Sequence, residues 1–453
     1  MQKHLEKFRK YFFKYSAAAI LFAIPLYAKF PYFNVVGTYV SVRLEDFLIL
    51  FITVLWVLFN ISNLRFFLKN KIVLSMLVFL IVSFLSLASA FLVTKSISLS
   101  VGIFHWMRRI EYFSAFFVGF TALQSLHDLK FYVKCLFIVV FMVFIYGLGQ
   151  KYLYWPIVTT QNSEYAKGVA LRYTPGAHIN STFAGHYDLA SFLVLILPLF
   201  FTFLFLVESK YKKILIMIVI ASGYWLLMNA ISRISIISFI IGVSIALFSI
   251  KKYKAIPLVI LVTLIISAFS TNLVSRYSNI FEVTIKKLYL NVKPSNIYAI
   301  ENTLELPKRH TNNEQKQTSS SPVFEDRSTS IRLNVEWPRA LRAFYKNPLF
   351  GTGFSSITLA TDNEYLRLLG EVGLVGFFGF SLLILRIFKM LIKNLPLAEV
   401  NFKNAFLAGI IGSFTAVFVN AIFIDIFEAS KFAIIFWLMV GLSMSLLNIK
   451  TNE

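Results

Sequence analysis

The chain has 453 residues, of which 58% are hydrophobic and 15% are charged, and its mean hydropathy is +0.72. Soluble domains carry roughly 25% charged residues, so this composition excludes an ordinary water-soluble fold and predicts an all-α polytopic membrane protein. The net charge of +22 could indicate a nucleic-acid partner. However, Lys and Arg gather at alternate ends of the apolar segments, which is the positive-inside pattern. This distribution indicates contact with anionic headgroups of the lipid bilayer and argues against nucleic acid.

Apolar segments of roughly 20 residues, the length needed to cross a hydrocarbon core, recur along the chain. About twelve can be placed, near residues 16–33, 44–62, 72–93, 109–126, 131–150, 188–207, 214–231, 234–250, 255–270, 364–386, 404–424 and 430–449. The first is the weakest because Pro25 and Lys29 interrupt it, and we expect a retained helix and not a cleaved signal peptide. Residues 1–453 are therefore expected to form a single membrane domain of about 12 transmembrane helices, with both termini in the cytoplasm.

Two long loops separate these segments and, with this topology, must face outward. Residues 151–187 are expected to form a first outer loop, and residues 271–363 a large outer loop that contains amphipathic helices and packs over the bundle. Towards the end of the second loop, apolar residues recur at helical spacing: Leu333, Trp337, Leu341 and Phe344. This spacing predicts an amphipathic helix along the membrane surface. Because proline is favoured in a first helical turn, the helix should begin near Pro338, after a turn carrying Arg332. It should end before Asn347-Pro348, where Gly351 and Gly353 permit a tight return.

Arginines near the outward ends of the spans are candidate anion ligands. Arg233 lies between two apolar segments that almost touch, and charge so close to hydrocarbon is expensive and usually functional. Its guanidinium offers bidentate geometry to phosphate oxygens; the alternative is a snorkelling arginine that anchors a helix end. Arg332 has a similar claim, and Arg339 would add positive potential above the bundle, although a solvated helix face explains either residue as well.

Acidic and amide side chains stand where the second loop meets the next span. Asp362 or Glu364 could act as a general base if packing and a nearby arginine orient it. The alternative is helix capping, in which Asp362 or Asn363 accepts amide hydrogens of the first turn and Glu364 favours the helix dipole. Glu371 lies deeper and beside several glycines, which indicates close helix packing and a polar contact inside the bundle.

The first outer loop contributes a second set of polar residues. Arg172 lies in this loop, and His186 and Asp188 stand at the entrance of a span, where they could hydrogen-bond a sugar or cap a helix starting near Leu189. His178 and His186 are not spaced for a metal on one helix, and no Cys or carboxylate cluster completes a zinc site. The sequence carries no phosphate-binding glycine loop and no nucleotide fingerprint. Neither a metal nor a cofactor is therefore expected.

Three of these elements together resemble the bacterial O-antigen ligase and O-antigen polymerase family. They are the stretch 172–198, the Ser232-Arg233 turn, and a run comprising Arg332, Trp337, Asn347-Pro348-Leu349, Gly351-Thr352-Gly353, Asp362-Asn363-Glu364-Tyr365-Leu366, Glu371 and Gly373. The resemblance covers roughly residues 165–386. Each motif is loose alone, but their order and spacing make the match fairly specific.

The resemblance implies an integral-membrane glycosyltransferase on the outer face of the bacterial plasma (inner) membrane. Such enzymes take a glycan from an undecaprenyl diphosphate carrier and are similar to metal-independent inverting enzymes. The resemblance implies that arginines bind the diphosphate, here Arg233, Arg332 and Arg172, and that a base activates the acceptor hydroxyl, for which Asp362 and Glu364 are the candidates. Glycan binding or structural support falls to His186, Asp188, Arg339, Asn363 and Glu371. The implied partners are the lipid-linked glycan, the bilayer, and a chain-length regulator and flippase.

One departure from the family pattern bears on which reaction is expected. Ligases typically have a histidine before the asparagine where this chain has Asp362, and an acidic residue there looks more like the polymerase branch, which joins lipid-linked repeat units. We favour a polymerase; the alternative is a ligase that attaches the glycan to lipid A-core or a similar acceptor. A transporter or flippase is the main rival of another class. It is disfavoured because the spans lack matched broken helices in two halves and the polar residues cluster at the outer end. A non-catalytic partner in an envelope assembly also stays open.

Overall fold

The computed structural model describes residues 2–28, 32–34, 41–158, 172–268, 330–395 and 401–449. The parts of the two predicted outer loops at 159–171 and 269–329 lie outside the described residues. The described helices are α1 (Gln2–Leu26), α2 (Leu44–Asn60), η1 (Ile61–Asn63), α3 (Leu64–Leu68), α4 (Lys71–Ser89), η2 (Ala90–Thr94), α5 (Leu99–Ala122), α6 (Leu126–Tyr152), α7 (His186–Leu206), α8 (Lys210–Ala230), α9 (Arg233–Ser249), α10 (Ala255–Ala268), η3 (Arg332–Glu336), α13 (Trp337–Lys346), α14 (Glu364–Lys393), α15 (Phe402–Asn420), η4 (Ile426–Glu428) and α16 (Ser430–Asn448). A short antiparallel pair, β1 (Phe33–Asn34) with β2 (Ser41–Val42), is a small addition to the all-α fold that the composition predicts.

A helix occupies the position of each predicted span, which confirms the all-α polytopic class. Within the described ranges, eight helical segments are long and apolar enough to cross a membrane: 44–68, 71–94, 126–152, 186–206, 210–230, 364–393, 402–420 and 430–448. The apolar helices α9 and α10 are shorter. The middle of α5 carries Arg108, Arg109 and Glu111, and the first half of α1 is basic. That these four helices also cross the membrane stays a prediction.

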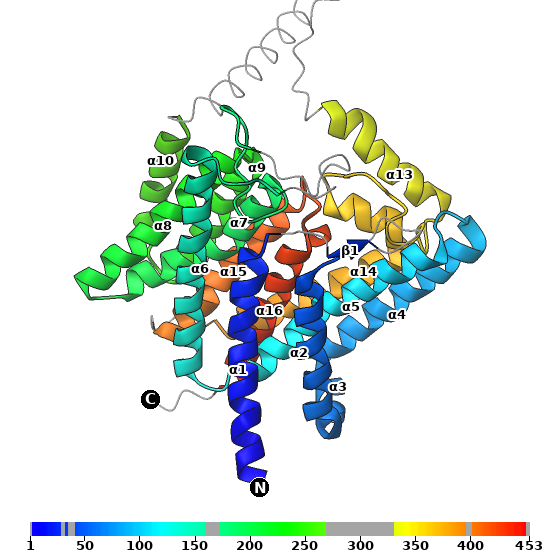
Figure 1. Ribbon diagram of the computed structural model, residues 1–453, viewed down its shortest axis with the longest axis horizontal. Helices are drawn as coiled ribbons and strands as arrows, with labels where there is room; N and C mark the ends of the chain where they lie inside the picture. Colours follow the sequence, from blue (N-terminus) through cyan, green and yellow to red (C-terminus); the bar gives the residue numbers. More distant parts are fainter. Residues whose placement is uncertain are drawn as a thin grey trace, which may run out of the picture.

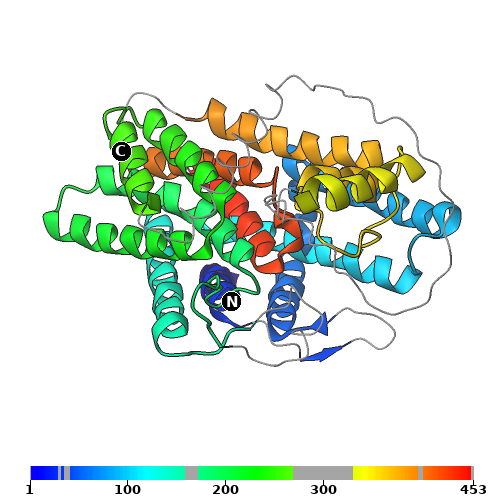
Figure 2. The same ribbon diagram turned by 90° about the horizontal axis from the view of Figure 1, so that it is seen from above.

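The bundle is organised around α16, which lies in the middle in both ribbon views (Figures 1 and 2). Helices α7 to α10 lie to one side of it, and α4, α5, α13 and α14 extend to the other. Small residues allow α16 and α5 to approach closely: a Cβ on Gly441 would lie 2.2 Å from the Phe116 carbonyl oxygen, and one on Gly119 would lie 2.5 Å from that of Leu438. Such contacts let helices pack where hydrocarbon gives no hydrophobic drive between them.

Several helix ends meet at one end of the bundle, which we call the polar end. Here α14 begins beside the end of α15, because the Glu364 amide donates to the Ala421 carbonyl at 2.9 Å. The buried Lys431, at the start of α16, donates to the carbonyls of Tyr27, just after α1, and Thr182, before α7. The other ends of these helices carry basic residues, among them Lys403, whose ammonium donates to the Ile449 carbonyl at 2.8 Å. The sequence pattern of alternating basic ends is thus reproduced in space.

The predicted amphipathic helix is confirmed as α13, which begins at Trp337 with Pro338 in its first turn. The π-helical turn η3 carries Arg332 directly before it, and the helix ends at Lys346, before Asn347-Pro348. Figure 1 shows α13 over the outer part of the bundle, at the opposite end from the start of α1. The turn η3, directly before α13, thereby places Arg332 at the polar end.

A break in α14 fastens the loop that follows α13. Gly373 has φ +65° and ψ −172°, so the helical hydrogen bonds around it are released. The loop takes them up: the Thr352 and Gly353 amides donate to the carbonyls of Gly370 and Glu371 at 3.0 and 2.8 Å. In return, the Leu374 amide donates to the Pro348 carbonyl at 2.8 Å. The loop is thereby held rigidly against α14 as it leads to the polar end.

Candidate functional site

Arg332 and Asp362, two of the predicted site residues, form an ion pair at the polar end. The Arg332 Nε and Nη2 atoms donate to Asp362 Oδ2 at 3.0 and 2.7 Å, and Nη2 also donates to the Tyr187 hydroxyl at 3.3 Å. The guanidinium lies 6.0 Å from the centre of the Phe423 ring. The two charged side chains are 11% and 18% exposed, so both remain reachable from outside. Four segments far apart in sequence therefore converge on this pair.

The surroundings make the Asp362 carboxylate a better base than an ordinary aspartate. Burial raises its pKa, the Arg332 guanidinium opposes that rise, and the negative charge of Asp425 adds to it, so that the pKa ends above its usual value. For Arg332, burial lowers the pKa, but Asp362 and Tyr187 together more than offset this effect, so the pKa is raised and the guanidinium stays charged. A carboxylate whose pKa lies closer to neutrality is a more effective proton acceptor.

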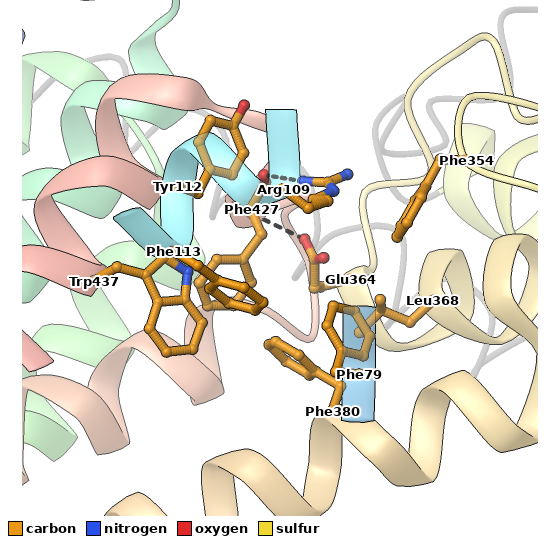
Figure 3. A pocket seen from close by; sticks show the side chains of 10 residues that line it. All are labelled: Phe79, Arg109, Tyr112, Phe113, Phe354, Glu364, Leu368, Phe380, Phe427 and Trp437. Atoms are coloured by element: carbon orange, nitrogen blue, oxygen red, sulfur yellow. Dashed lines mark hydrogen bonds between the residues drawn. The ribbon is translucent and has the colours of Figure 1, made fainter. Parts of the chain in front are cut away.

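Asn363 and Glu364 lie at the start of α14, as its capping residue and its first residue. Asn363 Oδ1 accepts the Leu366 amide at 3.0 Å, which confirms the capping interpretation for this residue. Glu364 is 3% exposed, and its Oε2 accepts the Phe427 amide at 3.0 Å. It lines a cavity of about 20 Å³, with room for about one water, together with Arg109 and aromatic rings. Figure 3 shows the Phe427 main chain bridging the Glu364 carboxylate and the Arg109 guanidinium. This interior position favours a supporting role, and direct catalysis by Glu364 stays a prediction.

A buried network of charges lies beside the pair, and sequence reasoning missed most of it. Arg367, 9% exposed, contacts the carboxylates of Asp425, Glu371 and Glu428 at 3.0, 3.3 and 3.6 Å. Glu428 in turn pairs with Arg109. The signal was available, since charges inside or next to apolar segments are normally paired and functional. Of this set only Glu371 was predicted; it is 2% exposed and accepts the Ser355 amide at 3.1 Å, which fits structural support.

Arg233 begins α9, directly after a turn in which Ile231 has φ +53°. Its side chain is partly buried. The hydroxyls of Ser232 and Ser235 lie 2.7 Å apart, and the Ser235 hydroxyl donates to Asn420 Oδ1 at 3.0 Å. Asn420 is the last residue of α15, next to the carbonyl that accepts the Glu364 amide. The Arg233 turn and the start of α14 are therefore anchored to the same helix end.

The first outer loop and α7 hold the other predicted residues. Arg172 is exposed, at the start of the described segment 172–185. His186 stacks on His178, with ring centres 4.2 Å apart and planes at 14°. The helix begins at His186 with Gly185 at the capping position, and both His186 and Asp188 lie in its first turn. Of the two alternatives, the one in which they cap a helix starting near Leu189 is therefore wrong, and the sugar contact stays a prediction.

Arg339 lies partly buried on α13, and its Nη1 atom makes no hydrogen bond to any described residue. Its role in glycan binding or structural support stays a prediction. Within the described ranges, no three His, Cys, Asp or Glu side chains gather as metal ligands would. Independence from metals stays a prediction.

Comparison with known families agrees with the resemblance seen in the sequence. Residues 215–381 match the family model described as O-Antigen ligase. This match supports the O-antigen ligase and polymerase family. It includes Arg233, Arg332, Asp362 and Glu371 but ends before Asp425. No curated protein matches the chain. Together with the apolar helices, the match supports a multi-pass membrane protein with glycosyltransferase-type activity in O-antigen biosynthesis.

Proposed function

We propose that the chain is a polymerase-type glycosyltransferase that transfers glycan from an undecaprenyl diphosphate donor to a lipid-linked repeat-unit acceptor. The observation that carries this proposal is the pairing of Arg332 with Asp362, a cation for the diphosphate beside a base for the acceptor, at the mouth of an apolar bundle. The family match supports the reaction class. The acidic residue before Asn363, where ligases typically have histidine, favours the polymerase.

Substrate binding would separate the pair. The donor diphosphate competes for the Arg332 guanidinium, since phosphate oxygens accept the same bidentate hydrogen bonds as a carboxylate. Burial raises the pKa of Asp362 while Arg332 holds it down, so moving the guanidinium to the diphosphate raises that pKa further. Donor binding thus has two effects: Arg332 binds the leaving group, and Asp362 becomes a stronger base.

The transfer itself needs no metal in this scheme. Asp362 takes the proton from the acceptor hydroxyl as the hydroxyl oxygen attacks the anomeric carbon of the donor sugar. The bond from that carbon to the diphosphate oxygen breaks with inversion, and the electron pair leaves with undecaprenyl diphosphate. Arg332, with Arg233 and Arg172, stabilises the charge that grows on this leaving group. Glu364, Asn363 and Glu371 support the segment, while His186, Asp188 and Arg339 are assigned to the glycan.

The proposed setting is the bacterial inner membrane, with the site on its outer face, both termini in the cytoplasm and residues 1–453 as one membrane domain. The basic residues at the opposite ends of α14 and α15 from the site support this orientation. A flippase must deliver lipid-linked units to that face, and a chain-length regulator is a further expected partner. A ligase is the second candidate, because the matching family model is described as O-Antigen ligase; it would use the same donor and differ only in the acceptor.

The test is to substitute the paired residues in cells that make the polysaccharide. Arg332→Gln and Asp362→Asn should each reduce polymer formation by about 100-fold or more, the usual effect of removing one preorganised polar group. Arg233→Gln should act in the same direction. The matched control is Arg386→Gln, a partly exposed arginine that bonds the Lys71 carbonyl at 3.0 Å, for which normal polymer is expected.

The species that accumulates separates the candidates. A polymerase leaves single lipid-linked units on the outer face, a ligase leaves finished polymer on the lipid carrier, and a flippase leaves units inside. Normal surface polysaccharide from correctly inserted Arg332→Gln and Asp362→Asn proteins would refute the proposal.

A further inference from the structure

Asp425, in the turn between α15 and η4, binds the main chain on both sides of Asp362. Its Oδ2 accepts the Thr361 amide at 2.7 Å, and its Oδ1 accepts the Asn363 amide at 2.9 Å. Hydrogen bonds to a charged acceptor are stronger than neutral ones. One carboxylate therefore binds the backbone amides of both residues next to the candidate base.

The segment held in this way has an unfavourable backbone conformation. Asp362 has φ +49°, in the left-handed region, which is sterically unfavourable for an L-residue. Such a conformation persists only where the surroundings determine it. Here the backbone is bound by Asp425, whereas the side chain is bound by Arg332, which lies on another element and also donates to the Tyr187 hydroxyl. Main chain and side chain of Asp362 are thus oriented independently.

Asp425 is itself held in place by Arg367. The Arg367 Nη1 atom donates to Asp425 Oδ2 at 3.0 Å and to the Leu359 carbonyl at 3.3 Å, and Nη2 donates to the Ile357 carbonyl at 3.0 Å. Because Arg367 is 9% exposed and lies on α14, it connects Asp425 to a rigid part of the bundle. The loop residues 357–363 are therefore gathered around one buried arginine.

We propose that Asp425 is a positioning residue for glycosyl transfer, which, fixed by Arg367, holds Asp362 in the orientation that receives the proton of the acceptor hydroxyl. This inference rests on the proposed function of Asp362 as the base. Asp425 lies outside the segment that matches the family model and was not expected from the sequence.

Asp425 also acts on Asp362 through its charge. The charged and titratable groups that interact with Asp362 are Arg332 and Glu336 on η3 and Asp425, and Tyr187 on α7 contacts Arg332. Burial raises the pKa of Asp362, Arg332 opposes that rise, and Asp425 adds to it. Removing the Asp425 charge therefore lowers the pKa of Asp362, and the acid limb of the activity profile should move to lower pH.

The experiment uses membranes from the producing bacterium, whose own lipid-linked glycan serves as substrate, and measures the rate of polymer formation against pH per inserted protein. Asp425→Asn should slow the reaction by about 10- to 100-fold, the usual result of misplacing a catalytic group by about 1 Å, and should move the acid limb to lower pH. Asp425→Glu keeps the charge but is one methylene longer, so it should slow the reaction without moving the limb. It also provides the rate measurement if the Asn variant fails to insert.

Two controls separate positioning from a general loss of stability. Asp128→Asn removes another buried carboxylate, paired with Lys14 at 2.7 Å and remote from the polar end, and should leave both rate and pH profile unchanged. Binding of undecaprenyl diphosphate to purified Asp425→Asn should equal that of the wild type, because Arg332 and Arg233 are intact.

If Asp362→Asn is inactive while both Asp425 variants react at the wild-type rate with an unshifted profile, the positioning role is overturned and the proposed function stands. Weakened binding of undecaprenyl diphosphate in step with the lost rate would also overturn it, in favour of a structural role. Full activity of Asp362→Asn would instead remove the proposed function itself.

Discussion

Replacing Arg367 with methionine, an unbranched side chain without charge, should destabilise the whole protein. The guanidinium is 9% exposed and contacts two carboxylates within 3.3 Å, those of Asp425 and Glu371. At an effective dielectric constant of about 20, each such contact is worth about 5 kcal/mol of attraction, most of which offsets desolvation. Without the arginine, both carboxylates stay buried and lose the cation that contacts them.

The two carboxylates keep some stabilisation in the variant, since Asp425 still accepts two amides and Glu371 still accepts the Ser355 amide. The net loss should therefore be that of one broken buried ion pair, about 3–5 kcal/mol. This is a large fraction of the roughly 5–15 kcal/mol by which folded proteins are stable. Adding Glu371→Gln to Arg367→Met should recover part of the loss, because it removes one of the stranded charges.

The free energy of unfolding can be measured by denaturant titration of the purified protein in one detergent. Arg386→Met is the matched control: its guanidinium donates to the Lys71 carbonyl at 3.0 Å and to the Ser75 hydroxyl on a partly exposed surface, so the loss in the free energy of unfolding should stay at about 1–2 kcal/mol. If Arg367→Met were no less stable than Arg386→Met, the description of Arg367 as the centre of a buried charge network would be wrong.

Two further predictions concern Gly373 and Glu336. Gly373→Ala places a Cβ 2.3 Å from the Leu349 carbonyl oxygen at a residue with φ +65°. Thermal unfolding should therefore show a free energy of unfolding that is lower by about 1–3 kcal/mol. Gly379→Ala, whose nearest neighbours would lie at 3.9 Å, should be neutral, and equal stability of the two variants would contradict the prediction. Burial, and then the charge of Asp362, raise the pKa of Glu336 to about 7, from 4.5. The folded state then holds the extra proton between these values, so stability should fall as pH rises from about 4.5 to 7. In Glu336→Gln, the free energy of unfolding should depend less on pH in this range. An unchanged dependence would argue against Glu336 as its source.

Much of the architecture was predictable because it depends on residues close together in sequence. Hydropathy located the helices, since lipid leaves the backbone no other way to satisfy its hydrogen bonds. Pro338 and Asn347-Pro348 located the start and end of α13 through the local geometry of proline. A cap at Asp362 or Asn363 was recognisable from their place before an apolar helix, and in the structure Asn363 is the cap. The same local reading misplaced the start of α7, which needs no side-chain cap and begins at His186.

The sequence by itself determined the class of the protein, the positions of its helices and the residues Arg332 and Asp362 as candidates for one site. Only the tertiary structure decided that these two residues form a pair and that Asp425 and Arg367 hold the segment 357–363 around Asp362. Asp425 is 64 residues from Thr361, 62 from Asn363 and 58 from Arg367, and Tyr187 is 145 residues from Arg332. No periodicity or motif spans such separations. These contacts exist because helix packing brings the ends of α7, α14 and α15 together, and packing depends on side chains throughout the bundle.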